Sequence, residues 1–444
     1  MAIATPSGAS ALGVVRLSGP DAVPVAGALL RAPSALESQP SHTIRKVHLV
    51  NHRAGTLIDE AMCVVMRAPR SPTGEDVVEL SCHGGPALLA MVVAELCRAG
   101  ARVAMPGEFT RRAFVNGRVD LARAEAVALL ISARTERAVT LAARALDGGL
   151  GRQIEALREA LIDLIARLEV GLDFPDDEVS LASIAARARV QSLAHEVDAL
   201  LAAAHRGRLV HEGVTIALVG RPNAGKSSLL NALLGRERAI VAPTPGTTRD
   251  VVEGTLEIAG VPVRLLDTAG IGQPGDPVEA EGMRRTNRAI EESDLVVLVV
   301  DGSVAPSADP LLEAVLAGRQ VLAVRSKCDL PPHPGVTIGT DSVAVSATAG
   351  SGLAALVTKL AAEVVRMAGI FNDESQIAAT LRQMEGLEGI GRSLKAAGGA
   401  LAELPLEVAL VDLRDALVGV SALLGCEVGD AVLDRIFATF CVGK

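Results

Sequence analysis

The chain has 444 residues, of which 49% are hydrophobic and 1% aromatic, and its formal net charge is −9. This length suggests about two to four domains, each with a substantial core. The acidic balance and the lack of a dense Lys/Arg run argue against a protein that grips nucleic acid by broad electrostatic attraction. An RNA partner must therefore be bound locally or with the help of another protein.

Membrane and secretory classes are also disfavoured. The apolar run at 84–94 is shorter than the ~20 residues needed to cross a bilayer, and the N-terminus lacks a signal-peptide pattern. The six cysteines are scattered and form no CxxC pair, which favours reduced thiols. We therefore expect a cytoplasmic protein with no membrane partner.

The first 115 residues predict a mixed α/β domain. Apolar residues with strand periodicity occur at 14–17, 62–66 and 76–80, and helical spacing follows at 86–99. His83, between a cysteine and two glycines, is expected in a turn rather than as a ligand or catalyst.

Helical periodicity dominates 116–209 and returns at 368–444, while 210–367 alternates strands and helices. Short apolar runs at 214–219, 263–266, 295–300 and 321–324 are typical of buried parallel strands in a doubly wound sheet. The pattern favours an α/β domain inserted into a helical domain. Two separate helical domains are the alternative.

The segment Gly220–Ser227 fits the phosphate-binding pattern GxxxxGK[ST], with a predicted strand before it and a predicted helix after it. Its glycines allow backbone N–H groups to approach phosphates at a helix N-terminus. Lys226 is expected to reach the β- and γ-phosphates, and Ser227 to coordinate Mg²⁺.

Four further elements follow in the order found in GTP-hydrolysing enzymes. A switch loop at 246–250 places Thr248 near Mg²⁺ and the γ-phosphate. Asp267 would hold a Mg²⁺-bound water, and Gly270 would sense the γ-phosphate. The segments 326–329 and 346–347 would recognise guanine, with Asp329 accepting hydrogen bonds that adenine cannot donate.

Two departures from the usual pattern matter. Ser326 stands where an Asn is usual, so we expect a weaker base contact and a weaker brace to the phosphate loop. Ile271 follows Gly270, where Ras-like enzymes carry a water-positioning Gln. Either hydrolysis is slow or another polar residue orients the water.

Sequence blocks spread over the whole chain resemble the MnmE (TrmE) family of bacterial tRNA-modification GTPases. The blocks are Ala4-Thr5-Pro6, Gly13–Gly19, Gly74-Glu75-Asp76, His83–Pro86, Pro106-Gly107-Glu108-Phe109, Leu172–Pro175, Gly220–Ser228 and the terminal Phe440-Cys441-Val442-Gly443-Lys444. The N-terminal and terminal blocks are the specific ones, since the nucleotide motifs are shared with other GTPases.

The resemblance implies an α/β and α multidomain fold. An N-terminal α/β domain (1–115) binds tetrahydrofolate and dimerises, a helical domain comprises 116–209 and 368–444, and a Ras-like P-loop GTPase domain (210–367) is inserted into it. It further implies a homodimer that forms a heterotetramer with the flavoprotein MnmG. Together they would add carboxymethylaminomethyl groups to the wobble uridine of certain tRNAs, with GTP hydrolysis stimulated by potassium.

The resemblance also implies roles for individual residues. Those for catalysis are Glu279, Lys226 and Cys441. Those for GTP binding are Asn223, Ala224, Gly225, Lys226, Ser227, Ser228, Ala242, Pro243, Thr244, Pro245, Gly246, Thr247, Thr248, Asp267, Thr268, Ala269, Gly270, Ser326, Lys327, Asp329, Ser346, Ala347 and Thr348. The residues implied to bind magnesium are Ser227 and Thr248, and those implied to bind potassium are Asn223, Ala242, Thr244 and Thr247.

For 5-formyl- or methylene-tetrahydrofolate, the implied contacts are Arg16, Glu79, Arg118 and Lys444, and Arg118 stands where a Lys is common. Glu279 would orient the attacking water, with Glu281 as its competitor. Cys441 is either a chemical group or a packed thiol. We expect the helix at 432–440 to dock the C-terminal tail against the N-terminal domain.

One functional alternative remains at this point. The chain could be a GTPase switch protein in ribosome assembly, without modification chemistry of its own. Reduced-folate binding would distinguish the two.

Overall fold

The computed structural model describes residues 1–51, 53–173, 179–236, 253–268, 286–305, 310–335, 342–370, 376–426 and 429–443. Its contacts divide the chain into two units. The first contains Met1–Ala128, Gly151–Val170 and Leu413–Lys444, and the second contains Leu129–Leu150 and Gly171–Asp412. The helices α5 (Leu121–Ser132), α7 (Gly149–Asp173) and α14 (Leu406–Leu424) contribute residues to both.

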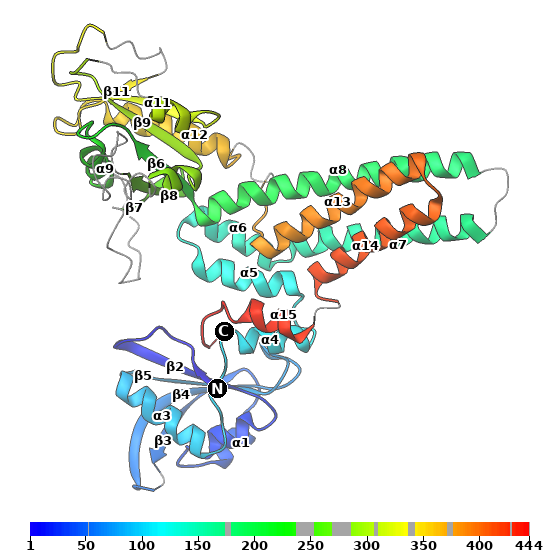
Figure 1. The fold of residues 1–444 in the computed structure, drawn as a ribbon. Helices are drawn as coiled ribbons and strands as arrows, with labels where there is room; N and C mark the ends of the chain where they lie inside the picture. Colours follow the sequence, from blue (N-terminus) through cyan, green and yellow to red (C-terminus); the bar gives the residue numbers. More distant parts are fainter. Residues whose placement is uncertain are drawn as a thin grey trace. The chain divides into compact units, whose positions relative to one another are not determined.

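The first unit is built on a five-stranded antiparallel sheet (Figure 1). Its strands, in spatial order, are β1 (Ala2–Ile3), β2 (Ser10–Ser18), β5 (Val77–Gly84), β4 (Thr56–Met66) and β3 (Thr43–Asn51). In β2 the buried residues alternate with more exposed ones, as a sheet with one covered face requires. The strands predicted at 14–17, 62–66 and 76–80 are confirmed, and each observed strand is longer than the predicted segment.

Helices α1 (Ala22–Gly27) and α3 (Pro86–Arg98) cover one face of this sheet, and α2 (Ser34–Glu37) lies beside α1. Leu89, Val92 and Leu96 of α3 pack into the same core as the sheet residues. On the opposite face, cross-strand register aligns Ile44 with Val64 and Lys46 with Met62. Ile44 and Met62 are 65% and 45% exposed, so this face keeps apolar surface open.

The C-terminal segment of the first unit packs against the helix that follows the sheet. Helix α15 (Asp430–Phe437) contacts α4 (Glu108–Val115). Phe437 and Phe440 are buried in a small core with Leu121 and Leu433. The chain's scarce aromatic residues are thus concentrated where the tail meets the N-terminal part of the chain.

The second unit contains a six-stranded sheet in which only the edge strand β7 runs antiparallel to its neighbour. Its spatial order is β11 (Val343–Ala344), β10 (Val321–Ser326), β9 (Leu295–Asp301), β6 (Val214–Val219), β8 (Val261–Asp267) and β7 (Glu253–Ile258). Its helices include α9 (Lys226–Leu234), α11 (Pro310–Leu316) and α12 (Leu353–Met367). The prediction of a doubly wound, mostly parallel sheet is confirmed.

The same unit contains the long helices α8 (Val179–Glu212) and α13 (Leu381–Glu403), which pack side by side, and the shorter α6 (Glu136–Leu146) (Figure 1). Where the chain returns from the α/β domain, the Ile377 carbonyl lies so close to Gly207 that a Cβ there would be 1.9 Å away. Thr380 then begins α13 with a capping box. The α/β domain is therefore an insertion between two helices that pack together, while the domain boundaries themselves stay predictions.

Within the described ranges, none of the helices has the length and apolar character needed to span a bilayer.

Candidate functional sites

The phosphate-binding pattern forms a loop between β6 and α9. Gly225 has φ +93° and Asn223 has φ +63°, conformations that let the chain curl back on itself before the helix begins. A Cβ on Gly220 would lie 2.3 Å from the Val299 carbonyl oxygen. The loop is thus held tightly against the end of the parallel sheet, where ligands of such folds bind.

Lys226 is buried at the first position of α9, and its ammonium group points into the loop. Its Nζ donates hydrogen bonds to the carbonyl oxygens of Gly220 (3.2 Å) and Arg221 (3.1 Å). Burial lowers the pKa of Lys226, while the nearby Asp267 carboxylate opposes that shift. The loop therefore presents a cation together with a helix N-terminus, an arrangement suited to phosphate groups.

Asp267 ends β8, on the strand beside β6, where its register partner is Leu218. Its Oδ1 atom is buried and has no hydrogen-bond partner among the described residues. A buried carboxylate oxygen without a donor is costly unless a ligand or ion completes it. Ser227, at the start of α9, is exposed, and its hydroxyl and the Asp267 carboxylate are oxygen donors of the kind that Mg²⁺ prefers.

The hydroxyl of the next residue has a structural task. Thr268 Oγ1 donates a hydrogen bond to the Leu218 carbonyl oxygen at 2.8 Å, and the residue is buried. Its side chain fastens the end of β8 to β6, which leaves its main chain as the part that could meet a nucleotide.

The predicted guanine-recognition loop follows β10 and is joined to the phosphate loop through Ser326. Ser326 Oγ donates to the Ala224 carbonyl oxygen at 2.6 Å, with the Val300 carbonyl oxygen 3.1 Å away. The residue is only 5% exposed. The shorter side chain therefore still reaches the phosphate loop, while the expected weakening of the brace stays a prediction.

Two contacts shape the rest of this loop. Lys327 has φ +56° and its Nζ forms an ion pair with Asp301 Oδ2 at 2.6 Å. Burial would raise the pKa of Asp301, but hydrogen bonds from Lys327 and Ser303 outweigh burial and lower it. Asp329 follows on the surface, with its carboxylate accessible.

The second guanine segment lies beside the first. The Cys328 N–H donates to the Val345 carbonyl oxygen at 3.1 Å. Ser346 is fully buried, and its Oγ accepts from the Ala349 N–H and lies 3.0 Å from the Thr348 hydroxyl. The structure thus brings together the loops of Asp329 and Ala347, as a base-binding site requires.

Several predicted site residues lie outside the described parts of the chain. They are Ala242, Pro243, Thr244, Pro245, Gly246, Thr247, Thr248, Ala269, Gly270, Glu279 and Lys444, together with Ile271 and Glu281. Their roles stay predictions.

The predicted folate residues Arg16 and Glu79 face each other across β2 and β5. They are register partners, and Arg16 Nε forms an ion pair with Glu79 Oε1 at 2.7 Å. The Arg16 guanidinium carbon also lies 5.7 Å from the centre of the Phe109 ring. The Arg118 side chain runs beside Gly74, and among the described residues no hydrogen bond or ion pair joins it to Arg16 or Glu79.

The C-terminal tail reaches this pair, as expected. Arg16 Nη1 donates to the Gly443 carbonyl oxygen at 3.3 Å, and the Gly107 N–H donates to the Cys441 carbonyl oxygen at 3.4 Å. Cys441 itself is exposed, whereas Phe440 is buried. The docking of the tail is confirmed, and the chemical role of Cys441 stays a prediction.

Sequence reasoning misplaced His83, which lies in β5 and not in a turn. Its Nδ1 is 2.7 Å from Asp59 Oδ1, and its backbone N–H donates to Asp59 Oδ2 at 2.9 Å. The alternation of Glu79, Ser81 and His83 was a strand signal that could have extended the prediction.

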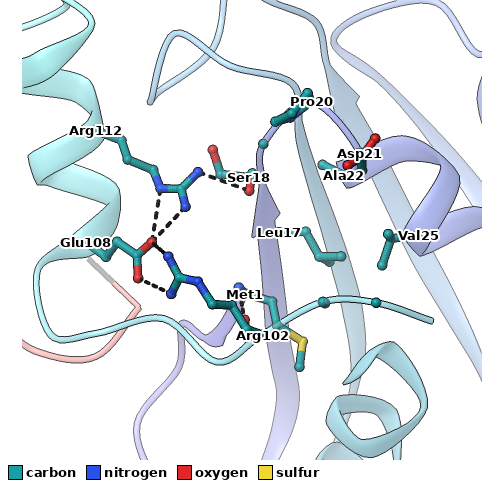
Figure 2. Close-up of a pocket in the computed structure, with 13 residues that line it drawn as sticks. Met1, Leu17, Ser18, Pro20, Asp21, Ala22, Val25, Arg102, Glu108 and Arg112 are labelled. Atoms are coloured by element: carbon teal, nitrogen blue, oxygen red, sulfur yellow. Dashed lines mark hydrogen bonds and ion pairs between the residues drawn. The ribbon is translucent and has the colours of Figure 1, made fainter. Parts of the chain in front are cut away.

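Sequence reasoning also missed a charged cluster that lines a cavity of about 190 Å³ in the first unit (Figure 2). Glu108, at the start of α4, binds both Arg102 (2.6 Å) and Arg112 (2.7 Å). Burial would raise the pKa of Glu108, but hydrogen bonds from Arg102, the Met105 amide and Arg112 lower it to about 2. The spacing of Glu108 and Arg112 on one helix face was the available signal.

Comparison with known proteins gives matches along the whole chain. A family model described as the MnmE helical domain matches residues 121–441, and one described as the GTP-binding protein TrmE N-terminus matches residues 1–118. A protein from Thermus thermophilus named tRNA modification GTPase MnmE is 44% identical over 447 residues, covering 100% of this chain and 98% of the relative. One of the same name from a Synechococcus strain is 42% identical over 438 residues, covering 98% and 95%.

Proposed function

Because the chain belongs to the MnmE family of tRNA modification GTPases, we propose that it hydrolyses GTP in the course of modifying tRNA. The observation that carries this proposal is the pairing of a buried ammonium with an unsatisfied carboxylate. Lys226 lies inside the phosphate loop, and Asp267, at the end of the adjacent strand, has an oxygen without a partner among the described residues. A nucleotide triphosphate with Mg²⁺ would satisfy both.

The residues of this chain divide the work as follows. Lys226 and the loop amides bind the phosphates, and Ser227 and Thr248 would hold Mg²⁺, with Asp267 acting through a bound water. The metal supplies neutralisation of phosphate charge. Asp329 selects guanine over adenine by accepting hydrogen bonds from the base, while Ser326 keeps its loop in register with the phosphate loop.

Hydrolysis requires a positioned water, and we assign that task to Glu279, with Ile271 unable to perform it. Potassium, held by Asn223, Thr247 and the carbonyl oxygens of Ala242 and Thr244, would neutralise charge between the β- and γ-phosphates. The exposure of Asn223 in the phosphate loop supports this assignment, because an exposed side chain is accessible to an ion.

The finer function that we propose is addition of a carboxymethylaminomethyl group to the wobble uridine of certain tRNAs, in a complex with the flavoprotein MnmG. A tetrahydrofolate would bind around Arg16 and Glu79, with Arg118 and Lys444 as further contacts. The docking of the tail on Arg16 supports a site formed by both chain segments. The exposed apolar face with Ile44 and Met62 supports a homodimer through this domain.

The test is nucleoside analysis of tRNA from cells that lack this chain. We expect the wobble modification to disappear, to return with the wild-type gene, and to stay absent with Lys226→Ala. A normal modification level together with altered ribosomal-subunit profiles would instead favour the ribosome-assembly switch.

A further inference from the structure

The segment Pro106-Gly107-Glu108-Phe109 has no part in the roles assigned so far, yet it contacts both halves of the proposed folate site. We propose that this segment is the socket that seats the C-terminal tail, and that Glu108 is the positioning residue that holds the socket in shape. The proposal rests on the folate function proposed above. Its structural half, the seating of the tail, can be tested without folate.

Gly107 is the point at which the tail enters the socket. A Cβ there would lie 2.6 Å from the Phe437 carbonyl oxygen, 2.9 Å from Phe437 Cβ and 3.0 Å from Phe440 Cβ. Its φ is +65°, and its N–H donates to the Cys441 carbonyl oxygen. Both the space and the backbone conformation therefore require glycine.

Phe109 connects the same segment to the ion pair on the sheet. Its side chain is buried, and its ring lies under the Arg16 guanidinium. Arg16 in turn donates to the Gly443 carbonyl oxygen. Gly107 and Phe109, which flank Glu108 in the sequence, thus contact the tail and Arg16, respectively.

Glu108 is held by donors from three residues, two in the loop before α4 and one on α4 itself. Its Oε1 accepts from Arg102 Nη2 and Arg112 Nη2, and its Oε2 accepts from Arg102 Nη1 (2.9 Å) and the Met105 N–H (2.8 Å). Arg112 is also paired with Glu75, which accepts from Ser18 at the end of β2. The carboxylate thereby fixes the first turn of α4 to the loop before it and, through Arg112, to the sheet.

Removing this carboxylate would leave two arginines facing each other without their shared anion. Like charges then separate, the turn with Gly107 and Phe109 loses its fixed position, and the tail loses its seat. Neither Gly107 nor Glu108 belongs to the nucleotide motifs, so GTP hydrolysis should be unaffected.

The experiment uses the full-length protein and four variants. Glu108→Gln removes the charge, and Gly107→Ala fills the socket. Gly55→Ala is the matched control for backbone strain, because Gly55 has φ +66° and nothing within 4 Å of its virtual Cβ. Arg98→Gln controls for loss of an ion pair elsewhere in the domain. Amide exchange of residues 430–443 reports tail seating, and calorimetric titration with 5-formyltetrahydrofolate reports the site.

We expect Glu108→Gln and Gly107→Ala each to speed exchange in the tail about tenfold or more and to raise the Kd for 5-formyltetrahydrofolate by about tenfold, a change worth ~1.4 kcal/mol. Both controls should match the wild type, and all five proteins should hydrolyse GTP alike. Unchanged tail exchange in both test variants would overturn the socket. Faster exchange with unchanged folate affinity would overturn the positioning role. A wild type that binds no folate would refute the proposed ligand, while the exchange data still decide the seating.

Discussion

At the scale of single residues, Ser326 shows how a departure from a motif can be accommodated. The usual Asn is replaced by a side chain one atom shorter in reach, yet its hydroxyl donates to the Ala224 carbonyl oxygen at 2.6 Å. A brace of this kind matters because it keeps the base-binding and phosphate-binding loops in a fixed relation before any ligand arrives.

Ser326→Ala should weaken nucleotide binding. The change leaves the Ala224 carbonyl without this buried donor, a loss of about 1 kcal/mol or roughly fivefold in affinity. Titration with a fluorescent GDP analogue measures it. The control is Thr358→Ala, because the exposed Thr358 hydroxyl donates to the Ala354 carbonyl oxygen within its own helix. Equal affinities of Ser326→Ala and the wild type would show that the brace carries no binding energy.

Asp329→Asn should shift preference from guanine to xanthine nucleotides. The amide presents a donor where the carboxylate accepts, so the pattern that suits the guanine N1–H and amino group is reversed. Competition between GTP and XTP for the purified protein measures the shift. Retention of full GTP affinity would place base recognition elsewhere.

Glu108 should make the protein sensitive to acid. Its pKa in the folded chain is about 2, below the ordinary value of 4.5, so its contribution is complete above pH 4.5 and is lost as the pH falls toward 2. The difference corresponds to at most ~3 kcal/mol. Urea unfolding of the wild type and Glu108→Gln should therefore differ clearly at pH 7 and much less at pH 3. An equal difference in unfolding free energy between the two proteins at pH 7 and pH 3 would contradict this prediction.

At the scale of elements, the packed helices α8 and α13 contain two glycines that differ in whether a side chain would fit at their position. Gly399 lies on α13 with nothing within 4 Å of its virtual Cβ, whereas Gly207 on α8 meets the Ile377 carbonyl at 1.9 Å. The first is a glycine that the helix tolerates, and the second is one that the crossing chain requires.

Gly399→Ala should raise the free energy of unfolding by about 0.5–1 kcal/mol, because alanine restricts the unfolded chain and favours helix. Gly207→Ala should lower it by about 1–3 kcal/mol, because the return segment must move away. Thermal melts of both variants beside the wild type give the signs. A higher free energy of unfolding for Gly207→Ala would mean that the close approach at Gly207 is not maintained in solution, and a lower one for Gly399→Ala would contradict the open space at Gly399.

The elements that sequence predicted best are those whose pattern is local. The parallel strands β6 and β9 are mostly apolar runs, and the phosphate loop is defined by glycines whose backbone conformation and close contacts are visible at Gly220 and Gly225. What sequence could not predict depends on partners far along the chain. The docking partner of the tail, Gly107, lies more than three hundred residues before it, and Arg112 reaches Glu75 on a different segment of the first unit.

At the scale of the whole molecule, the tail and the nucleotide motifs belong to different units. Deleting residues 441–444 should therefore abolish tRNA modification and leave GTP hydrolysis largely intact. Parallel assays of phosphate release and of tRNA nucleosides test this separation, with Lys226→Ala as the opposite control that loses hydrolysis. Loss of hydrolysis in the truncated protein would show that the two activities are coupled through the tail.

The insertion between α8 and α13 also delays the packing of these two helices during synthesis of the chain. Helix α8 ends at Glu212, and its partner α13 begins only at Leu381. A ribosome adding about 5–20 residues per second needs roughly 8–34 seconds to cover the interval. During that time Val190 and Val197, which are buried in the finished protein and face Gly398 and Gly391 of α13, lack the helix that will cover them. The nascent chain thus carries an uncovered apolar surface on α8 while the inserted domain is being made, a surface that a chaperone at the exit tunnel could shield.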